Sequence, residues 1–176
     1  MRGIRMLVEA SVVKDVRSLL EDLCEDWPGM EWCELSVLLA ATRALAELHQ
    51  SHHWQASGEA FYGDHLLFDR LYTATNEEVD KIAEKLVGLG TPEMVDAVAI
   101  AAQCHRVLNE LYATKARDIS ESSLAAEELY ISIVQTVSVA LDEQDRLTYG
   151  LDNMLADIAD KHEEHVYLLK RKISQR

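Results

Sequence analysis

The feature that most constrains this 176-residue sequence is a helical repeat of its apolar residues. In four long segments these residues recur at spacings of three and four, which places them on one face of an α-helix. Two prolines and seven glycines are too few turn residues for a many-stranded fold. No segment shows the apolar alternation that is typical of strands. The pattern therefore predicts an all-α protein.

The four long segments predict the helices of a bundle, at about 33–53, 60–88, 123–143 and 151–169. A shorter helix at about 93–111 lies in the long crossover between the second and third of them. Four long helices with one long crossover predict a ferritin-like four-helix bundle. An extra N-terminal helix at about 9–23 precedes Trp27-Pro28-Gly29. We expect an N-terminal extension over 1–32 and a bundle domain over 33–176.

Charge and cysteine content narrow the class of protein. Thirty-one acidic residues against 17 basic ones give a net charge of −14, which repels nucleic acid and anionic lipid and favours cations. No segment approaches the roughly 18 consecutive apolar residues of a membrane span. Cys24, Cys33 and Cys104 form no C-x-x-C pair. We expect three reduced thiols and a cytoplasmic protein.

One histidine and three carboxylates share a face of the second long helix. An α-helix turns by 100° per residue. Measured around the helix axis from His65, the positions of Asp69, Asp80 and Glu84 all lie within about 100°. The short connection after the preceding helix brings His53 close to His65. Imidazole and carboxylate ligands together suit Fe²⁺ or Zn²⁺ better than Mg²⁺ or Ca²⁺. The pattern therefore predicts a metal site, and its alternative is a solvated polar face.

These ligands cannot all meet within one chain. His65 and Asp80 are separated by fifteen residues, about 22 Å along a helix. Two copies of the helix packed antiparallel about a two-fold axis would bring the His65 end of one to the Asp80 end of the other. Such a contact forms two identical sites at once, with Tyr72 and Asn76 near the axis. We therefore expect a site shared between two subunits.

This ligand pattern resembles the signature of the Dps proteins, the mini-ferritins also called DNA-binding proteins from starved cells. The resemblance extends over about residues 35–170 and includes the last helix. It is carried by His53-Trp54, His65, Asp69, Asp80 and Glu84, and by the surrounding Gly58, Phe61, Leu67-Phe68-Asp69, Ala83-Glu84, Leu89-Gly90, Asp152 to Ile158 and His162 to Leu169. The resemblance implies a hollow homododecamer with ferroxidase centres at its two-fold interfaces.

In such a centre, His53, His65 and Asp69 would come from one chain, and Asp80 and Glu84 from its partner. The resemblance implies a cytoplasmic iron-storage ferroxidase that oxidises Fe²⁺ with hydrogen peroxide or O₂, keeps ferric iron in the shell and protects against oxidative damage. Trp54 would lie beside the iron and take up stray oxidising equivalents, or else anchor the core. The competing interpretation is a shell-forming protein that sequesters zinc or iron without turnover.

DNA binding is not carried over from the family. Members that bind DNA typically use a mobile lysine-rich tail, whereas the N-terminal segment here has one lysine, Lys14. The basic tail at 170–176 is interpreted as charge that favours a helix C-terminus. We expect no DNA binding.

Further histidines and acidic residues leave alternatives open. His49 and His52 are interpreted as structural, and the alternative is that they bind a second metal, since His49 lies one turn before His53 and could reach the same face. His162 and His165 resemble the Glu-x-x-His motif of bundle-core metal sites, but a matching motif on another helix is missing, so a second metal site there is the minor alternative. An acidic group would line the family's three-fold pore, through which iron enters, or form a solvated loop; it comprises Asp142, Glu143, Asp145, Asp152 and Asp157.

Overall fold

The computed structural model describes residues 10–25, 29–112, 116 and 118–174, and within these it contains helices and no strand. The all-α prediction is confirmed. The elements in chain order are α1 (Ala10–Cys24), α2 (Cys33–Gln55), α3 (Phe61–Leu89), the 3₁₀ helix η1 (Pro92–Val95), α4 (Ala97–Tyr112), α5 (Ile119–Glu143) and α6 (Tyr149–Ile173).

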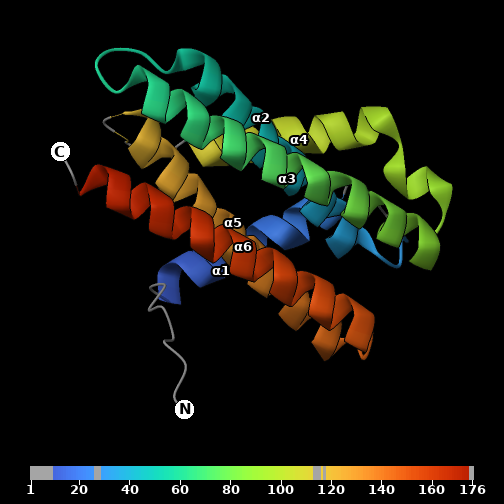
Figure 1. Ribbon diagram of the computed structural model, residues 1–176. Coiled ribbons are helices and arrows are strands. Elements are labelled where there is room, and N and C mark those ends of the chain that lie inside the picture. Colours follow the sequence, from blue (N-terminus) through green and yellow to red (C-terminus); the bar gives the residue numbers. More distant parts are fainter. Residues whose placement is uncertain (1–9, 26–28, 113–115, 117, 175–176) are drawn as a thin grey trace.

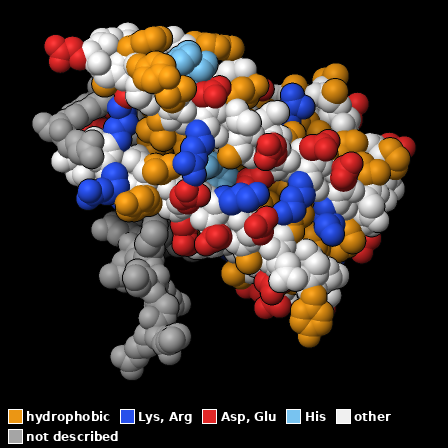
Figure 2. All heavy atoms as spheres, in the orientation of Figure 1, with side chains coloured by type: hydrophobic (Ala, Val, Ile, Leu, Met, Phe, Trp, Pro, Cys, Tyr) orange, Lys and Arg blue, Asp and Glu red, His pale blue; other side chains and the backbone are white. Residues whose placement is uncertain are grey.

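The bundle consists of α2, α3, α5 and α6, as the periodicity predicts. Figure 1 shows α3 and α6 side by side across the front, and α4 in the crossover that joins α3 to α5. Side-chain ion pairs link the two front helices: Arg70 of α3 to Glu164 of α6 at 2.6 Å, and Lys81 of α3 to Asp157 of α6 at 2.6 Å. Figure 2 shows basic and acidic side chains intermixed across this face.

α2 is the central helix of the fold. Almost every residue from Glu34 to Leu48 is buried, and α2 packs against α3, α4 and α5. A helix that is buried on most of its circumference belongs in a core. Leu38 and Leu45 are fully buried against the other helices, and truncation of such leucines to alanine costs about 2–5 kcal/mol. α2 therefore holds the side chains near its C-terminal end in fixed positions.

The start of α5 differs from the sequence prediction. The helix begins at Ile119 and not at about 123, because Asp118 serves as its N-cap. The Asp118 carboxylate accepts hydrogen bonds from the backbone N–H groups of Ser120 and Glu121, at 2.8 and 3.1 Å. This cap satisfies donors that the first helical turn would otherwise leave unpaired. Residues 119–122, which the predicted range leaves out, therefore form the first turn of the helix.

α1 packs on the outside of the bundle, chiefly against α5. Val16, Leu20 and Leu23 are buried in this contact. Arg17 also pairs with Glu143 of α5 at 2.7 Å. Residues 1–9 lie outside the described part of the chain, and the division at residues 32 and 33 stays a prediction.

The expectation of three reduced thiols is wrong for two of the cysteines. Cys24 ends α1 and Cys33 begins α2, and the structure joins them in a disulfide with Cα atoms 5.3 Å apart. The two cysteines are nine residues apart in sequence. Cys104 is free and buried, and burial raises the pKa of its thiol to about 12.

Among the described helices, α5 alone is long and apolar enough to cross a membrane by length and composition. Half of its apolar window is buried inside the bundle. Core helices of soluble proteins pass the same test. We therefore interpret α5 as one of the helices that form the core of this bundle.

Candidate metal centres

The structure brings His53 and His65 together at the corner between α2 and α3. Their rings stack with centroids 3.8 Å apart. The Nδ1 atom of His53 lies 2.9 Å from the backbone oxygen of His65, and the Nδ1 atom of His65 lies 3.2 Å from that of His53. A carbonyl oxygen only accepts hydrogen bonds, so each Nδ1 carries the proton. Each Nε2 then holds a lone pair that a metal ion can use.

The three predicted carboxylates lie on the same helix as His65. Asp69 follows His65 by one turn and is exposed, and Asp80 and Glu84 are exposed further along α3. With a rise of 1.5 Å per residue, Asp80 is about 22 Å from His65. Within one chain the structure therefore unites the two histidines and leaves Asp80 and Glu84 apart from them.

Large apolar side chains surround the histidine pair. Figure 2 shows hydrophobic side chains gathered around a surface histidine at this end of the molecule. Trp54 is 70% exposed, so within one chain it is not an anchor of the core. Phe61, Tyr62 and Leu66 are also exposed, at 46%, 72% and 48%. Exposed apolar side chains that lie together mark an interaction surface.

A groove follows the same helices away from the histidine pair. It has a volume of about 270 Å³. Its lining comprises Arg43, Ala46, Glu47 and Gln50 of α2 and Tyr72, Asn76 and Val79 of α3. Tyr72 and Asn76 are the two residues expected near the two-fold axis. They lie between His65 at one end of α3 and Asp80 further along it.

A second cluster of ligand-type side chains lies inside the bundle, and each of the four bundle helices contributes to it. Its members are His49 of α2, Glu78 of α3, Glu127 of α5, and His162 and His165 of α6. All five residues are buried, with exposures of 3% or less. We refer to these five residues as the core cluster.

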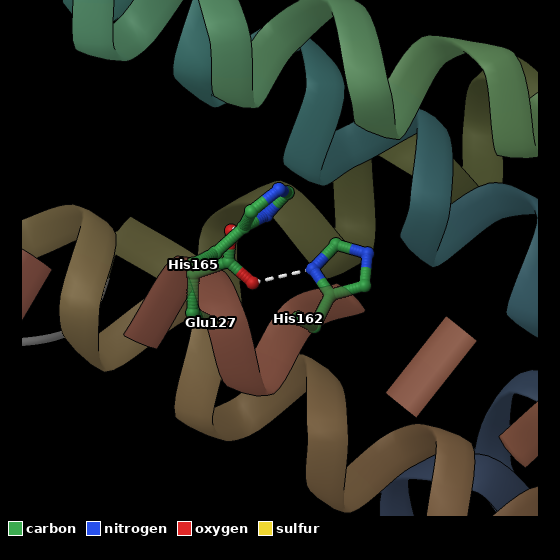
Figure 3. A group of neighbouring side chains, drawn as sticks. All are labelled: Glu127, His162 and His165. Carbon is green, nitrogen blue, oxygen red and sulfur yellow. Dashed lines mark hydrogen bonds and ion pairs between the residues drawn. The ribbon is translucent and has the colours of Figure 1, made fainter. Parts of the chain in front are cut away.

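Glu127 is the centre of the core cluster. Its Oε1 atom lies 2.8 Å from His49 Nε2 and 2.9 Å from His165 Nδ1. Its Oε2 atom lies 2.5 Å from His162 Nδ1, the contact drawn in Figure 3. The other ring nitrogen of His162 lies 2.9 Å from Glu78 Oε2. Because ionised carboxylates only accept hydrogen bonds, His162 bridges the two glutamates as an imidazolium.

The pKa values in the core cluster follow from this arrangement. Burial acts to lower the pKa of His162, but Glu127 and Glu78 outweigh it and raise the pKa to about 9. Burial acts to raise the pKa of Glu127, but the three histidines outweigh it and hold the pKa well below its usual value. Burial lowers the pKa of His49. Two buried carboxylates therefore face one imidazolium, and the Lys161 ammonium lies 3.7 Å from Glu78.

A hydrogen-bonded chain extends from the core cluster toward the end of α2. His49 donates through Nε2 to Glu127, so its Nδ1 accepts from the Ser123 hydroxyl at 3.3 Å. That hydroxyl in turn accepts from His52 Nδ1 at 2.7 Å. Burial lowers the pKa of His52 to about 4. His49 and His52 are thus neutral, buried and hydrogen-bonded.

Comparison with known proteins identifies the family. The sequence profile of the ferritin-like domain matches residues 34–175. The chain belongs to the ferritin-like family. Over 103 residues, 57% of this chain and 55% of the relative, it is 32% identical to a nutrient stress-induced DNA-binding protein of Nostoc sp.. Over 130 residues, 73% of this chain and 86% of the relative, it is 23% identical to DNA protection during starvation protein 2 of Bacillus anthracis.

The match covers about half the length of the Nostoc relative. Both relatives have names of Dps-type proteins. Together with the domain match, they confirm the resemblance to the Dps family.

Within this ferritin-like chain, two members of the core cluster, Glu78 and Glu127, were not predicted from the sequence. Sequence reasoning named His162 and His165 and assigned His49 to a structural role, but it did not connect them to Glu78 or Glu127. One signal was available: Glu127 lies on the buried face of α5 with Ser123 and Tyr130. A charged residue on an apolar helical face is rarely buried without partners.

Proposed function

We propose that this chain is an iron-storing mini-ferritin subunit that oxidises Fe²⁺ at a centre shared by two subunits. The observation that carries the proposal is the separation of the ligands along α3. His53 and His65 offer paired nitrogen ligands at one place, and Asp80 and Glu84 offer carboxylates about 22 Å away on the same helix. A second subunit related by a two-fold axis completes the ligand set.

The surface around the histidine pair supports this assembly. Trp54, Phe61, Tyr62 and Leu66 expose apolar area where the second subunit would pack. Burial of that area removes it from water, at about 25 cal/mol per Å². The assembled protein in this proposal is a cytoplasmic homododecamer that encloses a storage cavity.

The proposed chemistry follows from the ligand types. Asp69, Asp80 and Glu84 carry negative charge that stabilises Fe³⁺ relative to Fe²⁺ and so favours loss of an electron. Hydrogen peroxide takes one electron from each of two ferrous ions and, with two protons, leaves as two water molecules. O₂ is the alternative oxidant. The ferric product passes into the shell, and the removal of free Fe²⁺ and peroxide protects the cell.

Aerobic oxidation of Fe²⁺, followed by ultraviolet absorbance, tests the proposal. Purified protein is expected to oxidise Fe²⁺ well above the buffer rate, and faster with peroxide than with O₂. The double variant His53→Ala/His65→Ala should lose most of this rate. His105→Ala is the matched control, because His105 is an exposed histidine on α4. Wild-type kinetics in the double variant would place the oxidation elsewhere. If the unsubstituted protein also fails to oxidise Fe²⁺, the result would favour a zinc- or iron-sequestering shell without turnover.

A further inference from the structure

The core cluster has the donor set of a metal site that is separate from the subunit interface. Glu127, His162 and His165 each offer one ligand atom, and these three atoms lie within 4.8 Å of one another. One carboxylate oxygen and two imidazole nitrogens suit first-row divalent ions such as Zn²⁺ and Fe²⁺. We infer that Glu127, His162 and His165 bind one such ion inside each subunit.

The observed distances leave a short rearrangement for binding. Zinc lies about 2.0–2.1 Å from nitrogen ligands, so two ligand atoms on a tetrahedral ion are roughly 3.3 Å apart. In the structure, His162 Nδ1 and His165 Nδ1 lie 2.5 and 2.9 Å from the oxygens of Glu127. The two nitrogens lie against different oxygens of Glu127, Oε2 and Oε1, so a site that uses one carboxylate oxygen needs small torsional shifts of these side chains. In Figure 3 both rings lie against the carboxylate of Glu127.

The groups around these three ligands are arranged to orient them. His162 binds through Nδ1, while its Nε2 stays on Glu78 Oε2 at 2.9 Å. A carboxylate on the second nitrogen of a metal-binding histidine fixes the ring and increases its basicity. His49 donates to Glu127 Oε1 at 2.8 Å and holds that carboxylate in the same way. The ring of Tyr130 packs on His162 with centroids 4.4 Å apart.

The charge of the core cluster also fits a divalent ion. Glu78 and Glu127 are two buried carboxylates at the centre of an apolar bundle. Without an ion, their charge is balanced by the proton that His162 holds between them and by Lys161 nearby. A divalent ion that replaces this proton balances both carboxylates directly. Uncompensated buried charges are strongly destabilising, so the ion and the fold should stabilise each other.

The ligand count indicates a single ion. Di-iron and di-manganese bundles use a glutamate from each of two helices and a Glu-x-x-His motif from each of the other two. Here α6 supplies His162-x-x-His165, and Glu78 faces His162. The nitrogen-rich set supports one tightly held ion, and it gives the subunit a metal site independent of the proposed interface centre.

Metal titration of the His53→Ala/His65→Ala protein tests the inference, because that protein lacks the imidazoles of the interface centre. Chelator-treated protein is titrated with Co²⁺, whose visible absorption becomes intense at low coordination number, and then with Zn²⁺. We expect one tight equivalent per chain, an intense Co²⁺ band, and loss of that band as Zn²⁺ replaces Co²⁺. Absence of the tight equivalent and of the band would overturn the inference. This result does not depend on whether the protein oxidises Fe²⁺.

Substitutions in the same background assign the ligands. Glu127→Gln should weaken Co²⁺ binding by at least about 100-fold, and Glu78→Gln, which acts through His162, by about 10–100-fold. Glu128→Gln is the matched control, because Glu128 is partly exposed and pairs with Lys170 at 2.7 Å. Circular dichroism checks the helical fold of each variant. Unchanged Co²⁺ affinity in a folded Glu127→Gln protein would exclude this site.

Discussion

Glu127 Oε2 and His162 Nδ1 lie 2.5 Å apart at the centre of the bundle, where neither residue is exposed. Glu78 occupies the other ring nitrogen of His162, so the imidazolium is held between two carboxylates. Burial alone opposes this charged state, and the two glutamates overcome it. The stability of the metal-free protein therefore depends on the protonation of one histidine.

This dependence predicts how the free energy of unfolding changes with pH. The pKa of His162 is about 9 in the folded protein against 6.5 in the unfolded chain. Its contribution is therefore fully present below about pH 6.5 and is lost as the pH rises through about 9. Urea unfolding of chelator-treated protein should show lower stability at about pH 9.5 than at about pH 7. His162→Gln should abolish this decline, and equal stability of the unsubstituted protein at both pH values would contradict it.

On the acid side the same measurement should show a second decline. His52 has a folded pKa of about 4 and His49 a lowered one, so between about pH 6.5 and 4 the unfolded chain binds more protons than the folded protein. The pKa of Glu127 is depressed, so its contribution is present above about pH 4.5 and disappears as the pH falls through the lowered folded value. Stability is thus expected to be highest near neutral pH, and a steady rise toward acid would contradict this.

The disulfide between Cys24 and Cys33 leads to a prediction for the free energy of unfolding. Closing a loop with a sequence separation of nine residues stabilises the fold by about 2–3 kcal/mol in the chain-entropy description. A reducing environment such as the cytoplasm would open the bond. The protein for this experiment is therefore purified without reductant, so that the bond is intact at the start. Reduction should then lower the free energy of urea unfolding by about this amount.

The Cys24→Ala/Cys33→Ala variant is the control for this experiment, because added reductant should leave its stability unchanged. Thiol titration of the denatured, unreduced protein should find one free thiol, from Cys104. Three free thiols in that assay would show that the disulfide does not form.

The helices could be predicted from the sequence because helix formation depends on nearby residues. The apolar spacing of α2 and α3 is a local pattern, so their boundaries came within about two residues. The start of α5 was missed because the helix is capped by Asp118, ahead of the apolar pattern that begins at Leu124. The capping residue decides where a helix begins, and several residues near a helix end can act as the cap.

The core cluster could not be predicted in the same way, because it depends on which helix faces meet. His162 is 35 residues from Glu127 and 84 residues from Glu78 in sequence. Periodicity assigns each residue to a buried face but does not pair the faces of different helices. By contrast, the proximity of His53 and His65 followed from the short connection between two adjacent helices, 12 residues apart. The disulfide was missed because two cysteines nine residues apart carry no pairing motif in the sequence.

The tail at the end of α6 leads to a prediction about DNA. Lys170 pairs with Glu128 at 2.7 Å, and Lys172 pairs with Asp64. These basic groups are therefore partly neutralised by the bundle, and the chain carries a net charge of −14. Although both relatives have names that refer to DNA, we expect no stable binding of duplex DNA at about 0.15 M salt. A gel shift that disappears on deletion of residues 170–176 would contradict this.

Mixed assembly tests whether one iron centre is built from two chains. A subunit with His53→Ala/His65→Ala lacks the imidazoles, and a subunit with Asp80→Asn/Glu84→Gln lacks the distant carboxylates. Each variant alone should be inactive in Fe²⁺ oxidation. In a shell assembled from equal amounts, half of the two-fold pairs are mixed, and each mixed pair restores one of its two sites. About a quarter of the wild-type activity should therefore return.

A site within one chain forbids this recovery, because neither variant ever holds a full set of ligands. The two variants, carrying different affinity tags, are co-expressed and purified through both tags, so that mixed assembly is established before the rate is measured. Purification through both tags enriches mixed shells. The control is a shell purified in the same way in which the chains with either tag all carry His53→Ala/His65→Ala. If the mixed shells oxidise Fe²⁺ no faster than this control, His65 and Asp80 do not serve one centre and the interface proposal is wrong.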